Sequence, residues 1–191
     1  MTQTEKRQEI LQATLELIAE RGFHEAPIAL VAERAGVGAG TIYRYFANKE
    51  QLITELFQEI HARISAVMRD GYQVDQSIRQ RFHHLGTALL RYFIANPLEF
   101  RFVEQYMNSP YGIAFRRDRI MGKGEEGDLY RRLLEDGVAQ EIIKRLPLTV
   151  LLALAIGPLL TLARDQIAGF VEFDDGLLGR AVEACWDGVK R

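Results

Sequence analysis

The amino-acid sequence predicts an all-α protein of about nine helices. Apolar residues recur every three to four positions in nearly every segment, and no alternating run of β-branched residues bounded by turn residues occurs. Hydrophobic residues make up 48% and charged residues 26% of the chain, a balance typical of a soluble globular protein. A length of 191 residues allows a small domain beside a larger one.

The chain begins with two helices and a tight turn. A first helix is expected over residues 4–21, where an apolar stripe runs up to Gly22, and Phe23 is expected to fold back as a core anchor. A proline suits the first turn of a second helix over 27–35. Glycines after that helix predict a turn of about three residues, followed by a short third helix over 39–46.

A long helix is expected over residues 49–70. Asn48 is a suitable N-cap, and Gln51 stands three positions later as the partner in a capping box. Further helices are expected over residues 75–95, 97–107, 128–136, 147–170 and 174–189.

The remaining segments suggest where the domains divide. Residues 108–110 are expected to break a helix, the order of the segment up to about 126 is left open, and the glycines of 122–127 favour a loop. We expect three parts: a small N-terminal domain, a connecting helix, and a larger helical domain. They cover residues 1–48 (with the helix-turn-helix at about 27–46), 49–70 and 71–191.

The apolar stretch of residues 148–163 raises the question of a membrane span. It has 16 residues and is interrupted by Gly157 and Pro158, so a buried or interface helix is favoured over a membrane segment. The single cysteine, Cys185, allows no disulfide within the chain, and the chain's start resembles no signal peptide. A cytoplasmic location is expected.

The case for nucleic-acid binding is local, because the net charge is only −2. Between Arg34 and Lys49 there are three basic residues and no acidic one. In a helix-turn-helix, the first helix holds the second so that the exposed face of the second enters the major groove. Ile42 and Phe46 can pack against the first helix while Arg44 faces outward.

The stretch AERAGVGAGTIYRYFANKEQL, residues 32–52, resembles the signature of the TetR family, and the resemblance extends upstream through ILQATLELIAERGF. It implies a dimeric transcriptional repressor that binds a DNA operator and is released by a small-molecule inducer. It also implies the DNA-contacting residues: Thr41, Tyr43, Tyr45 and Lys49 on phosphates, and Ala39, Gly40 and Arg44 near bases. Hydroxyl and ammonium groups donate hydrogen bonds to phosphates, and a guanidinium can read guanine.

The resemblance further implies that residues 1–48 form a DNA-binding domain and residues 71–191 a ligand-binding and dimerisation domain. The inducer pocket is expected between helices of the second domain, and the dimer interface is expected on the last two helices. The expected ligand-binding residues are Glu104, Tyr106, Met107, Tyr111 and Phe115, for which an ordinary core role is an equal alternative. The expected dimer contacts are Leu159, Leu162, Val182 and Trp186.

Other functions are weaker interpretations. His83 and His84 are adjacent and point about 100° apart on a helix, so neither is expected to bind a metal, and no cofactor is expected. A DNA-bound architectural or division factor without an inducer shares the motif. A helical enzyme would need convergent polar groups, and the sequence offers no recognisable set of them.

Overall fold

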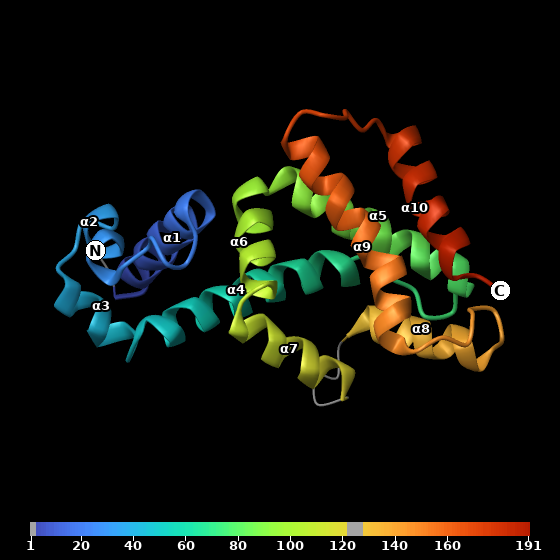
Figure 1. Cartoon of the computed structure of the whole chain (residues 1–191), viewed down its shortest axis with the longest axis horizontal. Helices are drawn as coiled ribbons and strands as arrows, with labels where there is room; N and C mark the ends of the chain where they lie inside the picture. Colours follow the sequence, from blue (N-terminus) through green and yellow to red (C-terminus); the bar gives the residue numbers. More distant parts are fainter. Residues whose placement is uncertain (1–2, 122–127) are drawn as a thin grey trace. The chain divides into compact units, whose positions relative to one another are not determined.

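The computed structural model describes residues 3–121 and 128–191, which form ten α-helices and no strand beyond one isolated bridge between Ile143 and Lys190 (Figure 1). The helices are α1 (Gln3–Arg21), α2 (Ile28–Arg34), α3 (Ala39–Tyr45), α4 (Lys49–Arg69), α5 (Ile78–Ala95), α6 (Pro97–Met107), α7 (Pro110–Ile120), α8 (Leu129–Ala139), α9 (Leu148–Ile167) and α10 (Asp175–Val189). The all-α prediction is confirmed, and the expected loop of 122–127 lies outside the described residues.

Helix α7 is the one described helix that the sequence analysis did not predict, and it occupies part of the segment whose order was left open. The Ser109 hydroxyl accepts a hydrogen bond from the Gly112 amide at 3.4 Å, and Pro110 stands in the first turn, where its missing amide costs nothing. The sequence Asn108-Ser109-Pro110 therefore ends one helix and begins another.

The helix expected over residues 128–136 extends to Ala139, so Gly137 lies inside α8 and does not follow it. A Cβ at Gly137 would stand 2.4 Å from the Cδ1 atom of Ile143. The glycine is thus required for close packing of the following loop. The chain turns after the helix instead, where Glu141 has a φ of 58°.

The chain forms two compact units that differ from the expected domains. Unit 1 contains residues 1–62 and 97–116, and unit 2 contains residues 63–96 and 117–191. The boundary therefore runs through α4, and α6 joins the N-terminal helices instead of the C-terminal part. The reason is that α6 packs on α1, where the Gln105 amide group donates to the Ile18 carbonyl at 2.9 Å.

Unit 2 is built on the mutual packing of α5, α9 and α10 (Figure 1). Gly86 of α5 allows a close approach of α10, since a Cβ at this glycine would lie 2.8 Å from the Cγ1 atom of Val182. By length and composition, α9 is the one described helix that could cross a membrane. Its inward stripe repeats every four residues and consists of Leu151, Ala155, Leu159 and Ala163.

The structure changes the expected dimer contacts. Leu159, Val182 and Trp186 are buried within their own protomer, where they fill the core of unit 2, and only Leu162 is partly exposed. The large hydrophobic side chains that α9 leaves exposed are Val150 and Leu154. The sequence predicted that α9 and α10 are helices, but it did not distinguish the buried apolar face of α9 from the exposed one.

Candidate nucleic-acid interface

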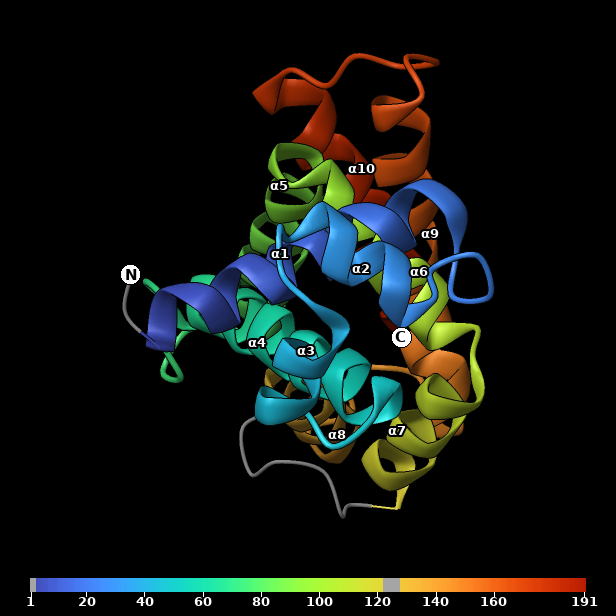
Figure 2. The same ribbon diagram turned by 90° about the vertical axis from the view of Figure 1, so that its left-hand side faces the viewer.

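Helices α2 and α3 form a helix-turn-helix within unit 1 (Figure 2). Gly36 has a φ of 62°, which favours glycine, and the Val37 amide closes the turn on the Ala32 carbonyl at 2.9 Å. Val31 and Ala32 of α2 and Ile42 of α3 are buried. The buried contacts hold α3 against α2, as the sequence predicts.

The opposite face of α3 is open to solvent. Ala39, Gly40, Tyr43 and Arg44 are exposed, and Tyr43 keeps 55% of its surface accessible. Thr41 is half-buried. Tyr45 is also half-buried, with its ring tilted against Phe46 at 6.4 Å. Most of the DNA-contacting residues implied by the resemblance therefore lie together on one accessible helix face.

The start of α3 is built from very small residues. Gly38 is the N-cap and makes no side-chain capping bond. Cβ atoms added at Gly38 or Gly40 would meet nothing within 4 Å. The start of α3, which we call the recognition helix, therefore presents only backbone and small side chains to the solvent.

Lys49 is placed differently from the other predicted contacts. Its ammonium donates to the Phe23 carbonyl oxygen at 2.6 Å and is partly buried. This burial lowers the pKa of Lys49. Lys49 is thus turned toward the protein, whereas Arg44 is exposed.

Helix α4 begins immediately behind the recognition helix. The Asn48 side chain accepts from the Gln51 amide at 2.8 Å, and the Gln51 side chain accepts from the Ala47 amide at 2.6 Å. The predicted cap is therefore confirmed, with the reciprocal bond made to the residue before Asn48.

Arg7 of α1 supports the other end of α3, a role that the sequence analysis missed. Its guanidinium bonds Glu55 of α4 at 2.6 Å and also bonds Glu59. It lies 5.5 Å from the centre of the Phe46 ring, which follows α3. These bonds to carboxylates raise the pKa of Arg7. One signal could have found it: a basic residue before the apolar stripe of α1 and an acidic pair on α4.

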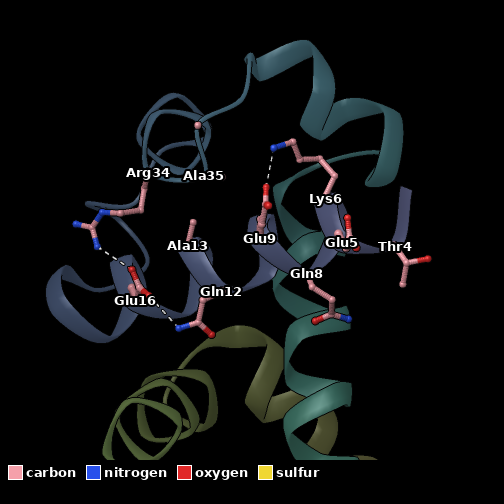
Figure 3. Close-up of a pocket in the computed structure, with 11 residues that line it drawn as sticks. Thr4, Glu5, Lys6, Gln8, Glu9, Gln12, Ala13, Glu16, Arg34 and Ala35 are labelled. Carbon is pink, nitrogen blue, oxygen red and sulfur yellow. Dashed lines mark hydrogen bonds and ion pairs between the residues drawn. The ribbon is translucent and has the colours of Figure 1, made fainter. Parts of the chain in front are cut away.

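A hollow of about 980 Å³ lies between α1 and the end of α2 (Figure 3). Arg34 points to Glu16, with a nitrogen–oxygen distance of 3.2 Å, and Lys6 bonds Glu9 within α1 (Figure 3). Arg34 also pairs with Glu20 at 3.1 Å. Arg34 is therefore neutralised by carboxylates. Of the three basic residues between Arg34 and Lys49, Arg44 is therefore the one that faces outward without a carboxylate partner of this kind.

Three of the five expected ligand-binding residues belong to an aromatic cluster in unit 1. We define this cluster as Phe23, Phe57, His61, Phe102, Tyr106, Tyr111 and Phe115, whose rings are in mutual contact. The structure brings Tyr106, Tyr111 and Phe115 together there, while Met107 and Glu104 are half-buried on α6. The rings pack on one another, as expected of a core.

A second hollow, of about 590 Å³, lies in unit 2 along α5 and the end of α4. Polar side chains from α5 line it, among them His84, Thr87 and Arg91. Neither hollow is lined by any of the five expected ligand-binding residues.

The described residues offer no group of three or more histidine, cysteine, aspartate or glutamate side chains that could hold a metal ion. His83 contacts Glu183, and His84 lies 3.1 Å from the Met68 carbonyl oxygen. Both histidines have protein partners.

This fold and this exposed helix face define a helix-turn-helix DNA-binding protein. Two family profiles agree. One, described as "Bacterial regulatory proteins, tetR family", matches residues 10–56, and another, "Tetracyclin repressor-like, C-terminal domain", matches residues 77–190.

Known proteins show the same relationship. A putative TetR-family transcriptional regulator of Vibrio parahaemolyticus has a solved structure with 30% identity and a TM-score of 0.79, covering 97% of this chain and 99% of that one. The "Fatty acid metabolism regulator protein" of Bacillus subtilis is 46% identical over 54 residues, only 28% of either chain. The same fold occurs in the crystal structure of the transcriptional regulator FadR from Bacillus subtilis in complex with stearoyl-CoA, with a TM-score of 0.74 and 18% identity. The match covers 95% of this chain and 98% of that one.

The chain belongs to the TetR family of bacterial regulatory proteins. Like the members of this family and its structural neighbours, it is a DNA-binding transcription regulator and not an enzyme.

Proposed function

We propose that the chain is a cytoplasmic repressor that binds a double-stranded DNA operator as a homodimer and is released by a small-molecule inducer. The observation that carries the proposal is the exposed face of α3, where Tyr43 and Arg44 stand beside Ala39 and Gly40 while Ile42 anchors the helix. An accessible short helix of this kind fits the major groove.

Within this proposal, the residues divide into two roles. The hydroxyls of Thr41, Tyr43 and Tyr45 donate to phosphates and fix the register on the duplex. Arg44 reads a base, because its guanidinium can donate two hydrogen bonds to guanine. With only small side chains at the start of α3, DNA shape contributes the remainder of the specificity.

The inducer acts, in this proposal, on the aromatic cluster. Phe115 meets Phe57 of α4 edge to face at 5.0 Å, so a ligand that separates these rings shifts α4. Two recognition helices reach successive major grooves only at a separation of about 34–36 Å. A shift of α4 that changes this separation lowers DNA affinity without any contact to DNA. The regulator crystallised with stearoyl-CoA is a precedent for a ligand on this fold.

The homodimer, in turn, rests on the outer face of α9. Val150 and Leu154 keep 40% and 38% of their surfaces exposed, on a helix whose other side fills the core of unit 2. An apolar face of this length on a soluble protein favours a partner, and a two-fold arrangement lets the same face meet itself.

Selection of duplexes from a random pool tests the central claim. The wild-type protein should enrich a two-fold symmetric sequence, and Arg44→Ala should relax the preference at one position of each half-site by about tenfold or more. Arg69→Ala, at an exposed site at the end of α4, is the matched control and should leave the preference unchanged. Enrichment of no sequence would favour an architectural DNA-binding protein instead.

A further inference from the structure

Lys49 is the first residue of α4 and lies three positions after Phe46, which ends the recognition helix. Its ammonium donates a short hydrogen bond of 2.6 Å to the Phe23 carbonyl oxygen, and the positive charge of the donor strengthens such a bond. A cation in the first turn of a helix is disfavoured by the helix dipole. The bond to a carbonyl outside the helix offsets that cost and ties the start of α4 to the turn that follows α1.

This turn is itself fixed by α6 and α7. Gly22 has a φ of 86° and redirects the chain, which leaves Phe23 outside α1. The Phe23 ring packs edge to face on Phe102 at 6.0 Å and on Tyr111 at 6.4 Å. Gln105 lies against Gly22, where a Cβ would stand 3.1 Å from its side-chain oxygen.

A second attachment joins the same helix to the same cluster. Phe57 stacks on Tyr106, whose ring also lies 6.1 Å from Tyr111. Lys49 and Phe57 are eight residues, or about 12 Å, apart on one face of α4. Both attachments therefore lead to Tyr111: one through Phe23 and the other through Tyr106.

We propose that Lys49 is a positioning residue for DNA binding: its bond to Phe23 fixes the start of α4, and with it the recognition helix, relative to α6 and α7. In this role the ammonium does not neutralise a phosphate. Phe23 becomes the element through which a displacement of α6 or α7 reaches α3. The positioning claim rests on the helix-turn-helix alone, and only its use in signalling rests on the proposed inducer.

The salt dependence of DNA binding separates positioning from phosphate contact. Each phosphate contact adds about 0.9 to the slope of log affinity against log salt. On the duplex selected by the wild-type protein, Lys49→Met should lower affinity about tenfold per subunit, the loss expected for one charged hydrogen bond, and leave the slope unchanged. Arg44→Met is the control that removes a base-reading cation from the exposed face, so it should lower affinity mainly for the selected duplex and also leave the slope unchanged.

Hydrogen exchange without DNA provides an independent measurement. In Lys49→Met, the amides of residues 23–26 and 49–53 should exchange about tenfold faster than in the wild type, because the tie between the two segments is lost. Arg44→Met should leave these amides unchanged. Lys49→Gln, which keeps a donor without the charge, should recover part of both losses and provides a second variant if Lys49→Met folds poorly.

A slope that falls by about 0.9 per subunit in both Lys49→Met and Lys49→Gln, with unchanged exchange, would overturn the proposal and assign Lys49 to a phosphate. If the wild-type protein selects no duplex, the proposed function fails. The exchange measurement would still decide whether Lys49 fixes the turn.

Discussion

The ring of Tyr106 lies parallel to the ring of Phe57, with centroids 3.8 Å apart and planes inclined by 5°. Tyr106 belongs to the last turn of α6 and Phe57 to the middle of α4. Burial raises the pKa of Tyr106, although its hydroxyl has a hydrogen-bond partner in Thr54 of α4. Tyr106 of α6 thus contacts α4 twice, through its ring on Phe57 and through its hydroxyl on Thr54. If α6 moves, either α4 moves with it or the stacked rings separate.

Truncation of Phe115 should alter the inducer response without harming the DNA-binding form. Phe115 touches Phe57 and His61 from α7 but is only half-buried, so Phe115→Ala removes one side of the aromatic cluster and leaves the Phe57–Tyr106 stack in place. We expect DNA affinity within about twofold of wild type without inducer, and a changed inducer concentration for half-release. Fluorescence anisotropy with a compound found by thermal-shift screening measures both.

Thr87→Ala in the hollow of unit 2 is the control for that experiment. If Thr87→Ala changes the response while Phe115→Ala does not, the inducer binds along α5. Linkage adds a further check, because operator DNA must weaken inducer binding by the same factor as the inducer weakens DNA binding.

The hydroxyl of Tyr130 is buried and has no hydrogen-bond partner among the described residues. Leaving such a group unsatisfied costs about 1–3 kcal/mol, so Tyr130→Phe should raise the free energy of unfolding by up to this amount. Burial also raises the pKa of Tyr130, so the folded state keeps its proton where the unfolded chain, with a pKa of about 10, loses it.

The contribution of Tyr130 to stability is therefore intact below about pH 10 and falls as the pH rises further. Chemical denaturation from pH 8 to 11 should show a flatter decline for Tyr130→Phe than for wild type. Tyr43→Phe, at an exposed position, should follow the wild-type curve. A less stable Tyr130→Phe protein would mean that the hydroxyl has a partner in solution.

Gly112 allows the close contact between the start of α7 and the end of α6. A Cβ there would lie 2.3 Å from the Tyr106 carbonyl oxygen and 2.5 Å from the Met107 Cα, and backbone atoms cannot move aside easily. Gly112→Ala should lower the free energy of unfolding by about 1–3 kcal/mol. A Cβ added at Gly179 in α10 meets nothing within 4 Å, so Gly179→Ala should be neutral or stabilising. Chemical denaturation of both variants and of the wild type measures these differences. Equal stabilities of the two variants would contradict the packing at Gly112.

A charge on the outer face of α9 should dissociate the proposed dimer. Leu154 is 38% exposed, so Leu154→Glu places a carboxylate on the surface without burying it in the protomer. Light scattering should give twice 21.8 kDa for wild type and 21.8 kDa for the variant at micromolar concentration. Val74→Glu, in an exposed loop, is the control and should stay dimeric. A Leu154→Glu dimer would place the interface elsewhere.

The sequence predicted the helix-turn-helix well because each of its determinants is local. Gly36 sets the turn, Asn48 caps α4, and Ile42 has to be buried if Arg44 is exposed. Each of these constraints operates within a few residues of chain.

Long-range contacts explain what the sequence could not predict. Lys49 matches a phosphate-binding position, yet its bond to Phe23 depends on where α1 ends relative to α4. Likewise, Leu159 and Leu154 look alike in the sequence, and only the packing of α9 on α5 and α10 decides which of them is buried. The assignment of α6 to unit 1 also depends on contacts between segments far apart in the chain.

The empty space around Gly40 makes this regulator a candidate for retargeting to new DNA sequences. Because a Cβ at this position meets nothing within 4 Å, a library of polar residues there would add base-reading groups without repacking the fold. Most replacements would also remove the flexibility that glycine gives a helix, worth about 0.5–1 kcal/mol. New operator preferences and a more stable scaffold can therefore be sought in the same substitution, with Ile42 and Phe46 left untouched.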